Sequence, residues 1–162
     1  MPHSMNRLIV LLLAMALLTS TASSQDKSKK ASDTQAATPQ AVSTKEAPAA
    51  IGPYSQGIKA GEFVFVSGVT ARDPATNKLV EGDITVQTER VLKNIEAVLA
   101  AAGTSADKVV KTTVFLKNIS DFAKMNEVYA THFKTSPPAR AAVGGVAIPG
   151  DALVEIEAVA LR

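Results

Sequence analysis

Apolar and polar residues alternate along the chain in a way that predicts one α/β domain over about residues 47–162. Five segments have the apolar, β-branched composition of strands: residues 55–59, 63–67, 109–116, 139–146 and 153–161. The first two are joined by Ala60-Gly61-Glu62, a short glycine-containing link that predicts a β-hairpin. The stretch of residues 72–78 has the composition of a turn.

Two further segments have the spacing of helices, which gives the order strand, strand, helix, strand, helix, strand, strand. In the first, apolar residues recur at steps of three and four from Ile84 to Ala102. Asp83 is available as its N-cap, and Gly103 follows its C-terminus. The second helix follows residues 118–121, which supply a turn and a cap. Its apolar stripe comprises Phe122, Met125, Tyr129 and Phe133.

The N-terminus has the three parts of a secretory signal peptide. Arg7 precedes eleven consecutive apolar residues, and small residues follow at positions 19–24. The apolar run is shorter than the roughly 20 residues that a transmembrane helix needs. We therefore expect residues 1–24 to be cleaved, leaving a periplasmic or secreted protein with no stable membrane anchor. An uncleaved N-terminal anchor is the alternative.

Residues 25–46 consist mainly of small, polar and charged residues, with Val42 as the only large aliphatic side chain. Such a segment buries too little apolar surface to offset the entropy lost on ordering. It is therefore predicted to be a disordered linker between the signal peptide and the domain, which begins at residue 47.

Composition narrows the class of protein further. The 162 residues are 46% hydrophobic, which is enough for the core of one domain. Residues 46–162 contain 12 basic and 13 acidic side chains, so the domain has no excess of positive charge for nucleic acid. The chain has no cysteine and therefore no disulfide. His3 lies in the leader and His132 stands alone, so we expect no metal site, and without a phosphate-binding glycine loop we expect no cofactor.

The strongest candidate for chemistry is an arginine followed fifteen positions later by a carboxylate pair. Pro137 and Pro138 cannot continue a helix, so Arg140 is expected to open a strand with its guanidinium held in place. In the last strand, a period of two puts Glu155 and Glu157 on one face and apolar residues on the other. A cation that suits a carboxylate ligand is thus expected near a group that handles a proton. The alternative is a set of solvated surface side chains.

Several stretches agree, in order and spacing, with one known family. They are residues 47–57, Val66-Ser67-Gly68, residues 110–115, Asp121-Phe122, Asn126, Tyr129, Pro138-Ala139-Arg140 and Glu155-Ile156-Glu157-Ala158. From about Ala47 to Arg162 the chain resembles the RidA/YjgF/UK114 family of reactive-intermediate deaminases. Because the matching stretches are well separated, the resemblance covers the whole predicted domain.

The resemblance implies a chorismate-mutase-like α/β (α+β) fold, with two helices on one face of a β-β-α-β-α-β-β sheet. It also implies a homotrimer with a central barrel and clefts between adjacent subunits. An open sheet face carrying Phe65, Val159 and Leu161 favours oligomerisation on physical grounds as well. The implied reaction is cofactor-independent hydrolysis of 2-imino or 2-enamino acids, such as 2-iminopropanoate and 2-iminobutanoate, to 2-keto acids and ammonia.

The resemblance assigns roles to individual residues. Arg140 would clamp the substrate carboxylate, and Glu155 would orient or deprotonate the attacking water. Tyr54 would close over the ligand, and Ser67, beside Gly68, would donate a hydrogen bond. The alternative for Tyr54 is a buried aromatic residue, and the alternative for Ser67 is a strand-ending turn.

Ala142 stands where many relatives have cysteine, which removes thiol chemistry and leaves a contact through the backbone. Two other functions remain open: a non-catalytic trimer that binds small carboxylates, and an RNA-cleaving translation inhibitor. The charge balance of the domain and export away from ribosomes disfavour the RNA-cleaving function. The signal peptide conflicts with the cytoplasmic location of most relatives, so a cytoplasmic protein is the alternative location.

Overall fold

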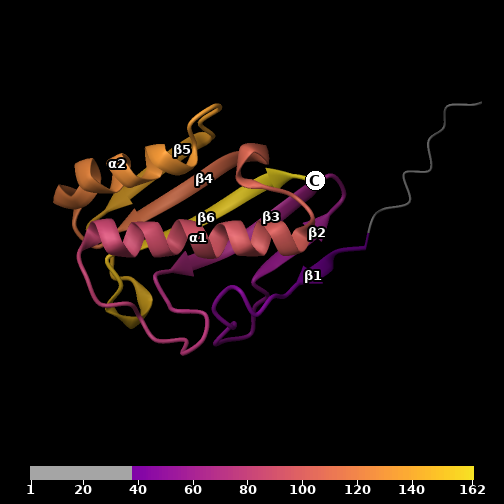
Figure 1. Ribbon diagram of the computed structural model, residues 1–162, viewed down its shortest axis with the longest axis horizontal. Coiled ribbons are helices and arrows are strands. Elements are labelled where there is room, and N and C mark those ends of the chain that lie inside the picture. Colours follow the sequence, from indigo (N-terminus) through magenta and orange to yellow (C-terminus); the bar gives the residue numbers. More distant parts are fainter. Residues whose placement is uncertain (1–37) are drawn as a thin grey trace, which may run out of the picture. The chain divides into compact units, whose positions relative to one another are not determined.

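A computed structural model describes residues 38–162, in which two α-helices cover one face of a mixed β-sheet (Figure 1). The strands are β1 (Gln40–Val42), β2 (Gly57–Ala60), β3 (Phe63–Thr70), β4 (Val109–Leu116), β5 (Ala139–Gly144) and β6 (Val154–Leu161). They lie in the order β1-β2-β3-β6-β4-β5, and only β4 and β5 are parallel neighbours. The helices are α1 (Ile84–Ala102) and α2 (Phe122–His132). The predicted fold class is confirmed, and the predicted signal peptide lies outside the described residues.

Strand β1 lies inside the segment that the sequence predicts to be a disordered linker. Gln40–Val42 pairs with β2 in antiparallel register, and the Val42 side chain is buried. The prediction of a linker up to residue 46 is therefore wrong at its C-terminal end. The buried Val42 side chain and the backbone pairing with β2 together hold this short strand at the edge of the sheet.

Helix α1 begins and ends at the residues that the capping signals predict. The Asp83 carboxylate accepts hydrogen bonds from the backbone N–H groups of Thr85 and Val86, at 3.0 and 3.1 Å. Gly103 follows the helix with a φ of 87°, a left-handed conformation that glycine adopts without strain. Both signals depend on neighbouring backbone groups, so they locate the two ends of the helix without reference to its packing.

Helix α2 packs its predicted apolar stripe on the same core. Tyr129 and Phe133 are buried with their ring centroids 4.5 Å apart, whereas Phe122 at the start of the helix is 36% exposed. Asp121 occupies the N-cap position, but its side chain makes no capping hydrogen bond, so the predicted cap is wrong. A short 3₁₀ turn at Ile119–Asp121 leads into the helix instead.

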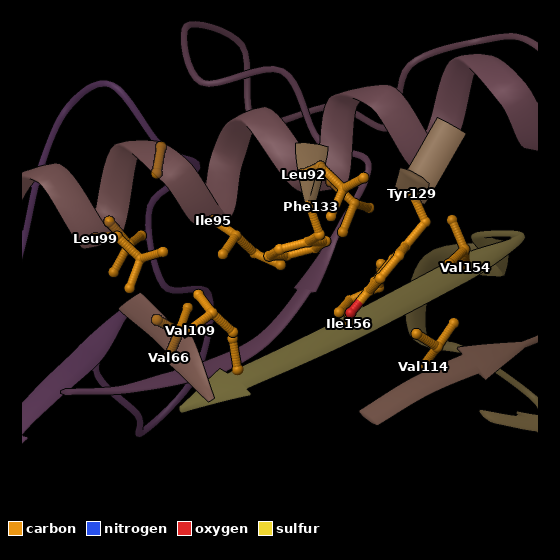
Figure 2. Packing of buried hydrophobic residues seen from close by; sticks show 14 of the residues in the cluster. Val66, Leu92, Ile95, Leu99, Val109, Val114, Tyr129, Phe133, Val154 and Ile156 are labelled. Carbon is orange, nitrogen blue, oxygen red and sulfur yellow. The ribbon is translucent and has the colours of Figure 1, made fainter. Parts of the chain in front are cut away.

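The core fills the space between the helices and the sheet. Figure 2 shows Leu92, Ile95 and Leu99 of α1 directed toward the sheet, where Val66 and Ile156 are buried. Alternate residues of β3 and β6 enter this core, as the period of two predicts. The remaining residues of these strands are therefore directed to the opposite face.

That opposite face is open in the described chain and carries apolar side chains. Phe65 is 46% exposed and Leu161 39% exposed, while Val159 is half-buried. Apolar residues gathered on a sheet face in this way indicate an interaction surface. Strand β5, at the other edge of the sheet, ends at Gly144 rather than at residue 146, because Gly145 has a φ of 77° that leaves the strand conformation.

Candidate active site

A β-bulge in β3 shapes the floor of the candidate site. Val66 pairs with Ala158 of β6 and Val69 pairs with Ile156, so β3 has one residue more than its partner over this stretch. The bulge lies at Ser67-Gly68, and β3 continues beyond it. The alternative interpretation of Ser67 as a strand-ending turn is therefore wrong.

Gly68 leaves the space that the Glu155 carboxylate occupies. A Cβ atom at position 68 would lie 3.0 Å from the carboxyl carbon of Glu155 and even closer to its Oε1. Gly68 does not have a positive φ, so space rather than backbone freedom is what requires glycine here. Any other residue at position 68 would push the carboxylate away from the bulge.

Glu155 is half-buried in an environment that disfavours its charge. Burial raises the pKa of its carboxyl group, and the negative charge of Glu157 raises that pKa further. The two glutamates share the open face of β6. Ile156 between them and Val154 before them are fully buried on the other face, as the period of two predicts. A carboxyl group with a raised pKa accepts and returns a proton more readily near neutral pH.

A cavity of about 510 Å³ opens beside Glu155. Its lining includes Tyr54, Ser67 and Gly68, so the structure brings four of the predicted site residues together. Arg72, which the sequence places only in a turn, lines the same cavity. The space suits a small molecule, since ligand pockets are typically concave and of a few hundred cubic ångströms.

Tyr54 and Ser67 have partners that narrow their roles. Tyr54 is 49% exposed, so it is not the buried aromatic of the alternative interpretation, and its hydroxyl accepts a hydrogen bond from the Ile51 N–H at 3.3 Å. The Ser67 hydroxyl donates to the Ser55 carbonyl at 2.6 Å. Because a hydroxyl has only one hydrogen, Ser67 is left as an acceptor toward a ligand. The predicted donor role of Ser67 is wrong in this geometry.

Gln56 supports the cavity wall, a role that the sequence does not predict. It is buried, and its Nε2 donates to the carbonyl oxygens of Thr44, Ala47 and Pro48 at 3.0, 3.1 and 2.8 Å. Its Oε1 accepts from the Thr44 N–H at 2.7 Å. These bonds fix a segment from which Ala47 and Pro48 line the cavity. A glutamine whose partners are distant backbone groups gives no signal in a single sequence.

Arg140 is held on the other side of the sheet, under α2. Its guanidinium carbon lies 4.5 Å from the ring centroid of Tyr129 and 5.6 Å from that of Phe122. The Tyr129 hydroxyl, directed toward the sheet in Figure 2, lies 2.7 Å from the Thr112 hydroxyl of β4. Burial raises the pKa of Tyr129, so its hydroxyl stays protonated. The sequence predicts a fixed arginine, but not that aromatic residues of the helix hold it.

Arg140 and Glu155 do not meet within one chain. Arg140 is in register with Thr112, which is buried on the helix side, whereas Glu155 lies on the open face. Ala142 belongs with Arg140, two residues further along the edge strand β5, and it is exposed. The expectation that the arginine lies near the carboxylate is therefore wrong for a single subunit, because β5 and β6 direct these two side chains to opposite faces of the sheet.

Two further features of residues 38–162 bear on function. No group of three or more His, Asp or Glu side chains in this part of the chain is arranged to hold a metal ion. His132 instead lies between two carboxylates of α1, with Nδ1 2.7 Å from Glu96 and Nε2 3.0 Å from Glu89. None of the helices described has the length and hydropathy to cross a membrane.

Comparison with known proteins shows which family the chain resembles. The family model described as endoribonuclease L-PSP matches residues 44–162. A RutC family protein of Pyrococcus horikoshii is 56% identical over 119 residues, which cover 74% of this chain and 94% of the relative. The 2-iminobutanoate/2-iminopropanoate deaminase of mouse is 45% identical over 121 residues, which cover 75% of this chain and 90% of the relative.

Comparison of the structure with solved structures gives relatives from the same family. The crystal structure of YyfA, a protein of the Rid family from Yersinia pestis, has a TM-score of 0.75 and 48% sequence identity to this chain. The match covers 77% of this chain and 100% of the Yersinia chain, and it confirms the chorismate-mutase-like fold. From its sequence, its fold and the extent of both matches, this chain belongs to the endoribonuclease L-PSP/RidA family.

Proposed function

We propose that this protein is a hydrolytic deaminase that converts short 2-imino or 2-enamino acids, such as 2-iminopropanoate and 2-iminobutanoate, to 2-keto acids and ammonia. The observation that carries the proposal is the Glu155 carboxyl group, seated on Gly68 in a small cavity with its pKa raised. The mouse relative named as a deaminase of these two imino acids supports the choice of substrate.

The residues account for each step of the hydrolysis. Glu155 takes a proton from water while the water oxygen forms a bond to C2 of the protonated imine and the C=N electron pair moves to nitrogen, which gives a neutral carbinolamine. The protonated Glu155 then returns the proton to nitrogen. The C–N bond breaks as the carbinolamine oxygen forms the C=O bond and gives up its proton to the departing ammonia, which leaves a 2-keto acid and an ammonium ion. Tyr54 lies at the cavity wall, where it would cover the ligand, and Ser67 offers a hydrogen-bond acceptor to the imine N–H.

The carboxylate clamp would come from a neighbouring copy of the chain. Arg140 is fixed on the helix side by Tyr129, so it cannot reach the cavity of its own subunit without losing that contact. Homotrimer formation through the exposed apolar face would allow the Arg140 and Ala142 edge of one subunit to complete the Glu155 cavity of the next. A bidentate contact from the guanidinium would then position C2 for attack.

The direct test is release of ammonia and keto acid from 2-iminopropanoate that an amino-acid oxidase generates in the assay. We expect the protein to accelerate this hydrolysis above the rate in buffer. Arg140→Lys should recover little of the activity that Arg140→Ala loses, because an ammonium group does not reproduce the planar fork. If the protein does not accelerate hydrolysis of 2-iminopropanoate or of 2-iminobutanoate but still binds a keto acid, a non-catalytic carboxylate-binding trimer would be favoured.

Subunit complementation tests the shared site. Arg140→Ala and Glu155→Gln should each be nearly inactive alone. Refolding an equal mixture of the two should restore about a quarter of the parental activity, because random assembly gives that share of cavities one intact residue of each kind. Sites built within single subunits would stay inactive in the mixture. That outcome would contradict the shared site while leaving the reaction itself open to the direct assay.

An RNA-cleaving function is the second candidate, because the matching family model carries an endoribonuclease description. The balance of 12 basic and 13 acidic residues over residues 46–162 weighs against it, since binding to a phosphate backbone depends on positive charge. Cleavage of a labelled RNA that Glu155→Gln abolishes would favour this candidate over the deaminase.

We also propose export, with residues 1–24 as the cleaved signal peptide. The support is Arg7 followed by the apolar run and small residues. Protein recovered from the periplasm of a bacterial host should begin between Ser23 and about Asp26. Full-length protein in the cytosol would support the cytoplasmic alternative instead.

A further inference from the structure

Arg72 is a positively charged residue in the cavity wall to which the proposed reaction gives no role. It lines the cavity together with Glu155 and Glu157. It lies two residues after the end of β3, where a bridge to Leu79 fixes its backbone. The cavity of one chain therefore contains a cation of its own, in addition to the Arg140 that a neighbouring subunit would supply.

Two backbone segments hold the Arg72 guanidinium in place. Its Nη1 donates to the carbonyl oxygen of Asn77 at 2.8 Å. Asn77 has a φ of 57°, a conformation that is uncommon for a residue other than glycine. On the other side Gly150 leaves room, because a Cβ atom there would lie 2.6 Å from Nη2 of Arg72. The guanidinium is thus positioned between these two backbone segments.

Most of the hydrogen-bonding capacity of Arg72 remains for a ligand. A guanidinium has five N–H donors, and the Asn77 carbonyl uses one of them. Among residues 38–162, no Asp or Glu forms an ion pair with Arg72. A held arginine with unused donors in a cavity wall is suited to bind a carboxylate through two parallel hydrogen bonds.

We propose that Arg72 is a specificity-determining residue that binds a second carboxylate on the ligand, so that the cavity prefers 2-imino acids with an acidic side chain. This proposal rests on the proposed function, in which the α-carboxylate is bound by Arg140 of a neighbouring subunit. Glu155 and Glu157 would otherwise repel a ligand with two negative charges. A cation in the same wall offsets that repulsion and favours the dicarboxylate over a monocarboxylate of equal length.

The test compares two five-carbon 2-keto acids that differ only at the far end. 2-Oxoglutarate ends in a carboxylate, and 2-oxopentanoate ends in a methyl group. Calorimetric titration of the full chain should show that it binds 2-oxoglutarate about tenfold more tightly than 2-oxopentanoate. This factor is the low end for a charged hydrogen-bonded pair, because Arg72 is partly exposed to solvent. Arg72→Gln should bring the ratio of the two affinities close to one.

A matched control comes from the C-terminal arginine. Arg162 Nη1 also donates to a backbone carbonyl, that of Gly61 at 3.2 Å, and Arg162 does not line the cavity. Arg162→Gln should leave the affinity ratio unchanged. Arg72→Lys keeps the charge and should retain part of the preference, and thermal unfolding of each variant separates a lost ligand contact from a lost fold.

The outcomes distinguish this proposal from the deaminase function. A parental ratio near one, or a ratio that Arg72→Gln does not change, overturns the role of Arg72. Binding of 2-oxoglutarate that depends on Arg72, in a protein that hydrolyses no imine, would refute the deaminase and support the second carboxylate site. Hydrolysis of 2-iminopropanoate by a protein without preference for the dicarboxylate would support the deaminase function and refute the second carboxylate site.

Discussion

Replacing Glu155 with glutamine separates the proposed catalytic role of this carboxylate from its effect on stability. Glutamine keeps the shape of the side chain above Gly68 but neither accepts nor returns a proton. General acid–base catalysis contributes about a hundredfold to ten-thousandfold, or about 3–5 kcal/mol of transition-state stabilisation. We expect the turnover number for 2-iminopropanoate to fall by that factor, while the affinity for a keto acid changes much less.

The same variant should unfold at a higher temperature near neutral pH. The folded-state pKa of Glu155 is raised, so the folded protein binds a proton more tightly than the unfolded chain does. The charged carboxylate therefore destabilises the fold above the unfolded pKa of about 4.3, and this cost disappears as the pH falls below that value. Glu155→Gln removes the charge and should be more stable than the parent at pH 7, with a smaller difference at pH 4.

Thermal unfolding and steady-state kinetics on the same samples separate the effect of Glu155→Gln on turnover from its effect on stability. Glu62→Gln is the matched control, because Glu62 is an exposed glutamate in the β2–β3 turn. This turn precedes β3, whereas Glu155 pairs with Thr70 at the opposite end of that strand. It should change neither turnover nor melting temperature. Full activity in Glu155→Gln, or a loss of activity that accompanies a clear drop in melting temperature, would refute the reasoning.

Four further predictions follow from individual contacts. Gly68→Ala should displace the Glu155 carboxylate and lower turnover by about a hundredfold. The melting temperature should change little, because only the end of a flexible side chain moves, and unchanged turnover would contradict the role of the glycine. Glu157→Gln removes a charge that raises the pKa of Glu155, so the acid limb of the kcat/KM profile should move to lower pH, and an unmoved limb would argue against Glu155 as the titrating group. Burial alone would lower the pKa of His132, but hydrogen bonds to two glutamates raise it. Its charged form therefore stabilises the fold below about pH 6.5, and this stability is lost as the pH rises through the raised pKa; denaturant unfolding of His132→Gln should show a weaker loss between pH 6 and 8, and an equal loss would contradict it. Phe65→Glu places a charge on the exposed apolar face and should yield smaller species in sedimentation, whereas an unchanged mass would rule that face out as the subunit contact.

Local signals in the sequence predict much of the fold correctly. Asp83 and Gly103 locate both ends of α1 because a cap depends on a few neighbouring backbone groups. The alternation around Glu155 gives the correct faces of β6 because a strand has a period of two. Asp121 shows the limit of such signals, since a residue of the right type at the N-cap position makes no capping bond.

Contacts between distant segments could not be read from the chain. Gln56 and Arg72 shape the cavity through carbonyl groups whose positions depend on the folded loops. Formation of strand β1 depends on burial of the Val42 side chain in the core, and composition alone does not reveal that burial. The separation of Arg140 from Glu155 follows from the parallel pairing of β5 with β4, and pairing partners are not encoded in the residues of one strand alone.

The separation of these two residues gives the oligomer a functional reason. Arg140 is held by Tyr129 on the helix side, and Glu155 is seated on Gly68 on the open face, so each chain carries two half-sites that its own contacts already position. Assembly of the proposed trimer would then join preformed halves with little further loss of side-chain entropy. Activity should consequently fall on dilution below the dissociation constant of the trimer while the helical signal of the folded chain persists. Activity that stays proportional to protein concentration through complete dissociation would show that one chain holds the entire site.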